Sequence, residues 1–303
     1  MKLNKINLLT LAALIVTPAL YATPVLSDTG TPNTVQGKDD PYNLPLAGPV
    51  MQAGSTAASQ SFDTTVMPSL LKFIQQALPE GQNNTKSKAF ELDPSKLVLA
   101  SSYNVTATFV YENAGYANAI GVDAVAAGQK GPQSAFDEVT SPTAKLVFPD
   151  ASTAAGGGAA IGTGTRTASQ PVVPGDFVNV GTYGKGTLLD FFLIANGANG
   201  GNQVISAKTA LNTDGFSQHV AEFSAHIFAV PQLNSPYLFL SFEDLWGGGD
   251  KDVNDTIIAL NVGTATVNAL LATPEPAMPL TFAACLGLAL VAVRKNKKAA
   301  ITV

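Results

Sequence analysis

The chain has 303 residues, of which 46% are hydrophobic and 13% are charged, and its formal net charge is −5. An acidic balance argues against binding to nucleic acid or to an anionic membrane surface, because both attract basic patches. The single cysteine, Cys285, excludes a disulfide within the chain, and its place in an apolar C-terminal run excludes a thiol nucleophile in the main body.

The N-terminus has the three parts of a secretory signal peptide. Lys2 and Lys5 give a positive start, an apolar stretch follows over 6–16, and small residues lead to Ala22. We therefore expect residues 1–22 to direct export, with signal peptidase cutting between Ala22 and Thr23.

The next segments differ in composition. Residues 23–61 are rich in Pro, Gly, Ser, Thr and Ala and poor in large apolar side chains, which predicts a flexible arm that buries too little surface to offset its ordering entropy. Residues 62–95 are expected to form a short helix and a connector. The helix begins near Pro68 and ends before Pro79 and Gly81, and its apolar side chains recur at helical spacing: Leu70, Leu71, Ile74, Ala77 and Leu78. We expect it to dock on the body, with binding to a partner as the alternative.

Residues 96–265 change to short alternating or β-branched runs separated by turn residues. The expected strands are 98–100, 105–111, 144–148, 177–180, 188–194, 220–228, 237–242 and 256–262. Many short strands without intervening helices predict an all-β domain, an antiparallel β-sandwich or jelly roll.

The candidate chemistry lies between the last two expected strands. This short segment holds five carboxylates and an asparagine: Glu243, Asp244, Asp250, Asp252, Asn254 and Asp255. Carboxylates crowded together repel one another, and a bound cation would stabilise them. Calcium is the expected ion, because it takes about 6 to 8 oxygen ligands and tolerates irregular geometry. The alternative is a solvated acidic turn with Lys251 as a partial counter-ion.

The spacing resembles a known calcium loop only at its start. Asp250, Asp252 and Asn254 alternate as in the first half of an EF-hand loop, but Asp255 occupies the sixth position, where glycine belongs, and Asn261 the twelfth, where glutamate belongs. We therefore expect a different calcium loop on a β scaffold.

The run 242–255, FEDLWGGGDKDVND, resembles the bacterial domain of unknown function 4114. Further stretches at 111–121 (YENAGYANAIG), 173–197 and His219-Val220 fit the same family, so the resemblance covers about 101–262. Val253, directly before the Asn-Asp pair, departs from the pattern, because an aromatic residue is usual at this position. The resemblance implies a secreted β domain without an established activity.

The C-terminal segment, 266–303, reads as a linker and a sorting tail. Pro274, Glu275 and Pro276 precede an uncharged apolar run over 277–293, and four basic residues follow within 294–298. As a helix this run would reach about 26 Å, at the short end of membrane spans. The order resembles the PEP-CTERM tail of Gram-negative bacteria, which implies a transient inner-membrane anchor, cleavage by an exosortase-type membrane peptidase and release to the cell surface. A permanent membrane anchor is the alternative.

Removal of both ends would leave a body with a net charge of about −10, which suits divalent cations or neutral partners. We expect no enzyme, because the histidines, His219 and His226, lie on opposite faces of an expected strand and no nucleophile motif is present. The expected function is structural or adhesive, in contact with an extracellular polysaccharide or other surface polymer. The alternative is a calcium-dependent carbohydrate-binding module with Trp246, Tyr111 or Tyr116 stacking on sugars.

Overall fold

The computed structural model describes residues 30–36, 41–78, 81, 91–92, 94–154, 164–208, 211–212, 222–225, 235–245, 249–250 and 252–272. The expected signal peptide, the Pro-Glu-Pro element and the apolar run 277–293 lie outside these residues. Within them, no helix has the length and apolar character needed to span a membrane.

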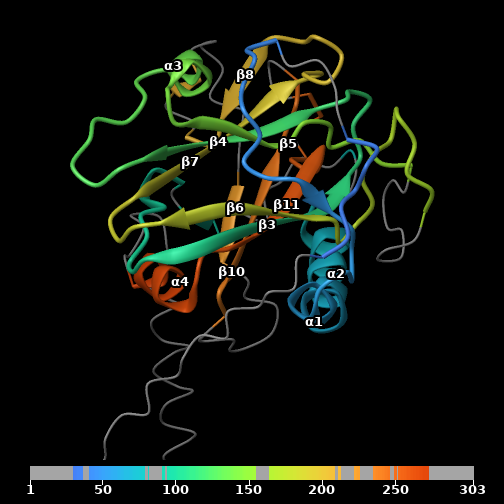
Figure 1. Ribbon diagram of the computed structural model, residues 1–303, viewed down its shortest axis with the longest axis horizontal. Coiled ribbons are helices and arrows are strands. Elements are labelled where there is room, and N and C mark those ends of the chain that lie inside the picture. Colours follow the sequence, from blue (N-terminus) through green and yellow to red (C-terminus); the bar gives the residue numbers. More distant parts are fainter. Residues whose placement is uncertain are drawn as a thin grey trace, which may run out of the picture.

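The described chain is mostly β, as the sequence predicts (Figure 1). The strands are β1 Val50–Met51, β2 Glu91–Leu92, β3 Tyr103–Glu112, β4 Ala119–Val125, β5 Ala144–Phe148, β6 Phe177–Tyr183, β7 Leu188–Ala195, β8 Gln203–Ser206, β9 Glu222–Ala225, β10 Tyr237–Phe242 and β11 Thr256–Asn261. The helices are α1 Ala57–Thr65, α2 Met67–Ala77, α3 Ala135–Thr140 and α4 Thr264–Leu271, with a 3₁₀ turn at Pro94–Lys96.

The strands form two antiparallel sheets. One has seven strands in the order β1-β6-β3-β11-β10-β9-β2, and the other has four in the order β5-β4-β7-β8. Both sheets contribute to one buried core, in which Phe109 of β3, Phe148 of β5 and Phe191 of β7 are fully buried. Side chains alternate between the two faces of a strand, so each sheet can bury one face against the other.

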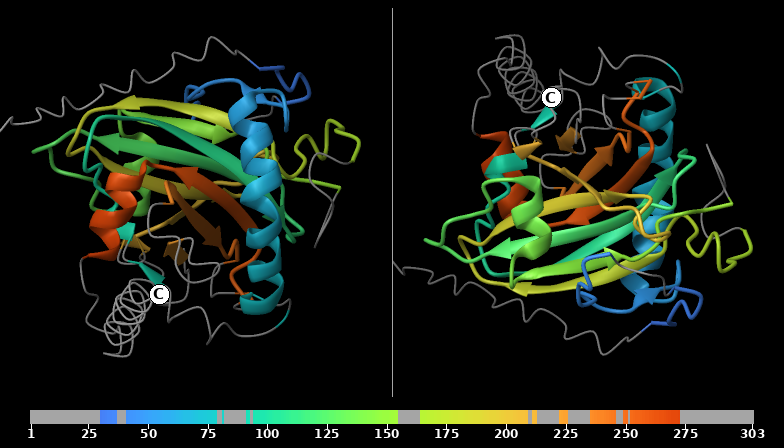
Figure 2. Two further views of the ribbon diagram at one scale, coloured as in Figure 1. Left: turned by 90° about the horizontal axis from the view of Figure 1, so that it is seen from below. Right: turned by 90° about the horizontal axis from the view of Figure 1, so that it is seen from above.

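The outer face of the seven-stranded sheet is covered by α1 and α2, which stand as a column beside it in Figure 2. Met67, Leu70 and Ile74 are buried there against Phe239 of β10 and Ile257 of β11. The predicted helix is thus confirmed as α2, with Pro68 in its first turn. The outer face of the four-stranded sheet carries α3, through Ala135 and Val139 packed with Phe192.

The expectation of a flexible arm over 23–61 is corrected for its described part. β1 pairs with β6, Val50 and Met51 are buried, and α1 begins at Ala57. Polar anchors explain how a segment poor in large apolar residues becomes ordered: the Asp176 carboxylate accepts hydrogen bonds from Asn33 Nδ2 at 3.1 Å and from the Ala53 N–H at 2.9 Å. Such bonds stabilise local order without a large apolar contribution.

Other differences are confined to short elements. The expected strand 98–100 forms only an isolated bridge between Val98 and Leu188. β4 was not predicted as a strand, because Gly121 and Asp123 interrupt its apolar pattern, yet it lies at the centre of the four-stranded sheet. The shortest helices, α3 and α4, were also not expected, since a six- or eight-residue helix carries little periodic signal.

Candidate metal centre

The acidic segment is the loop of the β10–β11 hairpin. The register of these strands ends with the pair Phe242 and Thr256, so residues 243–255 emerge together from one end of the seven-stranded sheet. β11 is hydrogen-bonded to both β3 and β10, which makes this hairpin internal to the sheet and its end a firmly held base for the loop.

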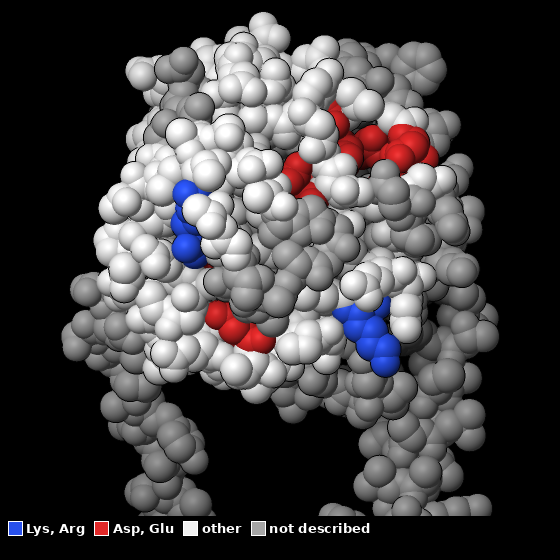
Figure 3. Space-filling view, turned by 90° about the vertical axis from the view of Figure 1, so that its right-hand side faces the viewer, with Lys and Arg blue, Asp and Glu red and all other residues white. Residues whose placement is uncertain are grey.

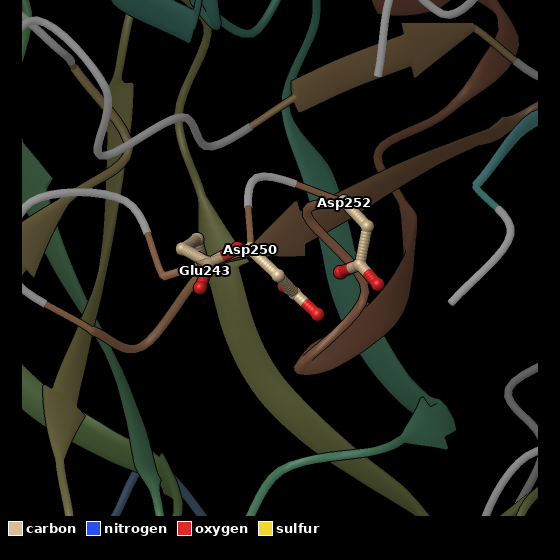
Figure 4. Close-up of side chains that lie close together, drawn as sticks. All are labelled: Glu243, Asp250 and Asp252. Carbon is tan, nitrogen blue, oxygen red and sulfur yellow. The ribbon is translucent and has the colours of Figure 1, made fainter. Parts of the chain in front are cut away.

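Three carboxylates of this loop converge. Glu243, Asp250 and Asp252 each offer an oxygen, and these oxygens lie within 4.8 Å of one another. Figure 4 shows the three side chains in a row, with Asp250 between the other two. Glu243 and Asp252 are buried, whereas Asp250 is exposed. Solvent therefore reaches the group at Asp250.

Glu243 is the most constrained member of the group. It is 1% exposed, and neither of its carboxylate oxygens accepts a hydrogen bond of standard geometry within the described chain, although the Asp255 carboxyl and the Val253 N–H lie beside it. Burial, followed by the charges of Asp250 and Asp252, raises the pKa of Glu243 to about 7. A buried carboxylate without a donor is costly unless a proton or a cation compensates it.

Gly249 allows the loop to close over Glu243. Gly249 has a φ of +41°, and a Cβ at this position would lie 1.9 Å from Glu243 Oε1. Val253 also has a positive φ, of 56°, which is unusual for a β-branched residue and accompanies functional or strained turns. The local backbone therefore brings Glu243 and the second half of the loop into contact.

The C-terminal end of α2 fixes the second half of the loop. The Gly81 N–H donates to Asp252 Oδ2 at 2.7 Å, and Asn254 Nδ2 donates to the Leu78 carbonyl oxygen at 3.1 Å. Asn254 Oδ1 is itself buried without a partner among the described residues. The site is thus built from two regions far apart in the sequence.

Asp244 and Asp255 are turned to another set of partners. Asn118 Nδ2 donates to Asp244 Oδ2 at 2.7 Å, and the Asp244 N–H donates to Asp255 Oδ2 at 2.7 Å. Burial and then the charge of Asp244 raise the pKa of Asp255 to about 9, with the adjacent Glu243 carboxyl contributing in the same direction. Of the six predicted ligands, the structure therefore brings Glu243, Asp250 and Asp252 together, with Asp255 beside Glu243.

Sequence reasoning missed Glu112, the last residue of β3, and Asn118, which directly precedes β4. Burial is the main cause that raises the pKa of Glu112 to about 7, and the charge of Asp244 adds to it. The only available signal was their position in the stretch 111–121, and nothing local showed that it would lie beside the acidic loop.

The aromatic candidates have different surroundings. Tyr111 is buried in the contact between the seven-stranded sheet and α2, against the expectation that it stacks on a sugar. Its position on β3 directs the ring to the helix-covered face. Tyr116 is 40% exposed in the loop between β3 and β4. Trp246, His219 and His226 lie outside the described residues.

The surface agrees with the negative charge of the chain. On the face drawn in Figure 3, acidic side chains form a band near the top, and the few basic side chains lie apart from it. A surface of this kind attracts cations and repels polyanions.

Comparison with known proteins gives one partial match, and it includes this loop. Residues 184–263 match the domain of unknown function DUF4114. The DUF4114 match covers less than half of the chain; it spans β7 to β11 and includes the whole acidic loop, whereas β3 and β4, which the sequence resemblance also included, lie outside it. No curated protein and no solved structure matches the chain.

Proposed function

We propose that the loop 243–255 binds a divalent cation, calcium in the first place, and that this β domain acts as a structural or adhesive element outside the cell. The observation that carries the proposal is Glu243, a buried carboxylate that accepts no hydrogen bond of standard geometry within the described chain and whose oxygen lies within 4.8 Å of oxygens from Asp250 and Asp252. A cation at their common centre would compensate all three charges.

The ligand chemistry favours calcium over other metals. Oxygen donors suit hard cations, and an irregular loop of carboxylates suits calcium better than magnesium, which requires near-ideal octahedral geometry. Glu243, Asp250 and Asp252 would hold the ion, and Asp255 and Asn254 are the nearest additional oxygen donors of the loop. The ion would supply structural rigidity to the hairpin end.

Calorimetric titration of the full chain with calcium tests the metal proposal. We expect heat of binding and a higher melting temperature, since a ligand present at 100 times its Kd stabilises a protein by about 2.7 kcal/mol. Glu243→Gln should abolish both effects, whereas Asp137→Asn, which removes an exposed carboxylate on α3, should leave both unchanged. Absence of heat and of stabilisation at millimolar calcium in the wild-type chain would reject the site.

The location outside the cell is proposed from the sequence pattern at the two ends of the chain. We propose export through residues 1–22, transient anchoring by the run 277–293, and cleavage near Pro274, Glu275 and Pro276 by an exosortase-type peptidase. Intact-mass analysis of the protein from its native envelope checks this. A mature start at Thr23 and an end near Pro276 are expected, and a C-terminus at Val303 would exclude the cleavage.

A second candidate function is calcium-dependent carbohydrate binding, which the exposure of Tyr116 favours. Tyr116 lies two residues before Asn118, whose amide donates to Asp244 in the acidic loop. An exposed aromatic ring beside a bound ion could stack on a sugar. A glycan array with and without a chelator tests it: Tyr116→Ala should abolish binding without changing the melting curve, and an array without binding would exclude this function. Neither proposal assigns catalysis to the chain.

A further inference from the structure

A second group of buried carboxyls lies far from the acidic loop, beneath α3. On the outer face of the four-stranded sheet, Asp190 of β7 shares its face with Phe192, which packs under α3. Asp123 of β4 is the direct cross-strand partner of Asp190. Two like charges placed opposite each other destabilise a sheet unless their surroundings compensate them.

α3 adds a third carboxyl to this pair. Glu138 is 0% exposed and Asp190 is 1% exposed, and the two lie close enough for the charge of Asp190 to raise the pKa of Glu138. Ser206 Oγ donates to Glu138 Oε1 at 2.6 Å, and Lys208 Nζ pairs with Asp190 Oδ2. The remaining oxygens, Glu138 Oε2 and Asp190 Oδ1, have no donor among the described residues.

The other charged groups around α3 are already accounted for. Asp123 Oδ1 accepts hydrogen bonds from Ser141 Oγ and Thr143 Oγ1, and Lys208 is the cation of Asp190. On β5, Ala144 and Leu146 face α3, so Lys145 between them points to the opposite face. Asp137 of α3 is exposed. Among the described residues, one positive charge therefore faces three carboxyls in an enclosed space.

We propose that Glu138 is protonated at neutral pH and donates a hydrogen bond to the ionised Asp190. This carboxyl–carboxylate pair would hold α3 on the four-stranded sheet. A single proton between the two free oxygens gives each of them a partner. Burial, followed by the charge of Asp190, raises the pKa of Glu138 well above its ordinary value, which agrees with this arrangement. A metal ion is a poorer fit here than in the acidic loop, because the ammonium of Lys208 already occupies Asp190 and the pair is closed to solvent.

The pair should make the attachment of α3 sensitive to alkaline pH. Because the pKa of Glu138 is raised in the folded state, its contribution to stability is full below the ordinary glutamate pKa and is lost as the pH rises through the folded value. Above that value, an ionised Glu138 would repel Asp190 and Asp123 and weaken the contact between α3 and β7.

The test compares Glu138→Gln with the wild-type full chain, because the glutamine amide is neutral at every pH and can still donate to Asp190. At pH 6 the melting temperature of the variant should be close to that of the wild type. Between pH 6 and 10 the melting temperature of the variant should fall less than that of the wild type. The difference should be roughly 3–5 °C for each pH unit by which the pKa of Glu138 in the folded protein exceeds 6, up to pH 10. Asp137→Asn on the same helix removes an exposed charge and should follow the wild-type pH profile.

A direct readout separates protonation from simple packing. In a chain with ¹³C-labelled glutamate carboxyls, the resonance assigned through Glu138→Gln should show a protonated carboxyl at pH 7. A Glu138 carboxyl that titrates in the range of an exposed glutamate would overturn the proposal. A Glu138→Gln variant whose melting temperature differs from wild type by the same amount at every pH would overturn it as well.

Discussion

Single side chains decide what the acidic loop can do, and Glu243 and Gly249 are the most informative. Glu243 is enclosed, while Gly249 passes so close to its Oε1 that any side chain there would collide with it. The positive φ of Gly249 adds a second reason for glycine, because residues with a Cβ rarely adopt this conformation. Both the close approach to Glu243 and the backbone conformation therefore favour glycine at this position.

Gly249→Ala should lower both stability and calcium affinity. A positive φ alone costs a residue with a Cβ about 1–2 kcal/mol, and the collision with Glu243 adds to this. Gly115→Ala is the matched control, because Gly115 has open space around the position of a Cβ. Urea unfolding and calorimetry of the two variants provide the comparison, and equal effects of both substitutions would contradict the close approach.

Calcium affinity should rise with pH. Calcium binds carboxylates in their ionised form, whereas the pKa of Glu243 is about 7 and that of Asp255 about 9 in the free protein. Binding should therefore release protons, and Kd should fall by up to about tenfold per pH unit for each proton released. Calorimetry in buffers of different ionisation enthalpy between pH 6 and 9 measures this release; a Kd independent of pH would mean that these carboxyls do not bind the ion.

The stability of the calcium-free protein should fall as the pH rises. Both folded pKa values are raised above the unfolded ones, so the protonated carboxyls stabilise the fold at acidic pH and this contribution is lost as the pH rises toward about 9. The melting temperature measured with a chelator should therefore decrease as the pH rises through this range, and added calcium should reduce the decrease. A chelated protein that becomes more stable between pH 6 and 9 would contradict these assignments.

At the level of elements, α2 has two roles that meet at its C-terminal end. Its apolar face covers the outer side of the seven-stranded sheet, and the residues just after it bind Asp252 and Asn254 of the loop. The helix thus connects the packing of the sheet to the geometry of the candidate metal centre. α3 has a comparable position on the other sheet, where Glu138 reaches Asp190.

Leu70→Ala should destabilise the protein through the contact between α2 and the sheet. Leu70 is fully buried in that contact, and truncation of such a side chain costs about 2–5 kcal/mol. Lys72→Ala lies on the exposed side of the same helix and should cost little. Denaturant unfolding of both variants measures the difference, and a loss of less than about 1 kcal/mol for Leu70→Ala would indicate that α2 is loosely attached.

At the level of the whole molecule, the buried carboxylate of Asp176 connects segments that are distant in the sequence. Asp176, just before β6, is fully buried; it pairs with Arg166, and it also accepts hydrogen bonds from Asn33 and the Ala53 N–H. This carboxylate joins the N-terminal segment to the seven-stranded sheet. Asn33 and Ala53 are therefore held by a group more than a hundred residues away, and the pairing of β1 with β6 holds the segment in addition.

Arg166→Met should destabilise the protein strongly, because it leaves the buried Asp176 carboxylate without its cation. Removal of one partner of a buried ion pair costs about 3–5 kcal/mol. Arg166→Met combined with Asp176→Asn should recover part of this loss, since no unpaired charge remains. Urea unfolding of the single and double variants measures both, and a single variant as stable as wild type would show that the ion pair is dispensable.

The sequence by itself determined the features that depend on local pattern. Alternating residues predicted β5 and β10 with their observed bounds, helical spacing and Pro68 predicted α2, and composition located the acidic loop between β10 and β11. These features could be predicted because side-chain period and turn chemistry act over a few residues.

Only the tertiary structure decided which acidic side chains meet. It separated Glu243, Asp250 and Asp252 from Asp244, placed Asn118 and Glu112 beside the loop, and brought Glu138 of α3 onto Asp190 of β7. It also ordered the N-terminal segment through Asp176. These contacts join residues far apart along the chain, and their geometry is set by strand register and by the packing of helices on sheets, which no local pattern encodes.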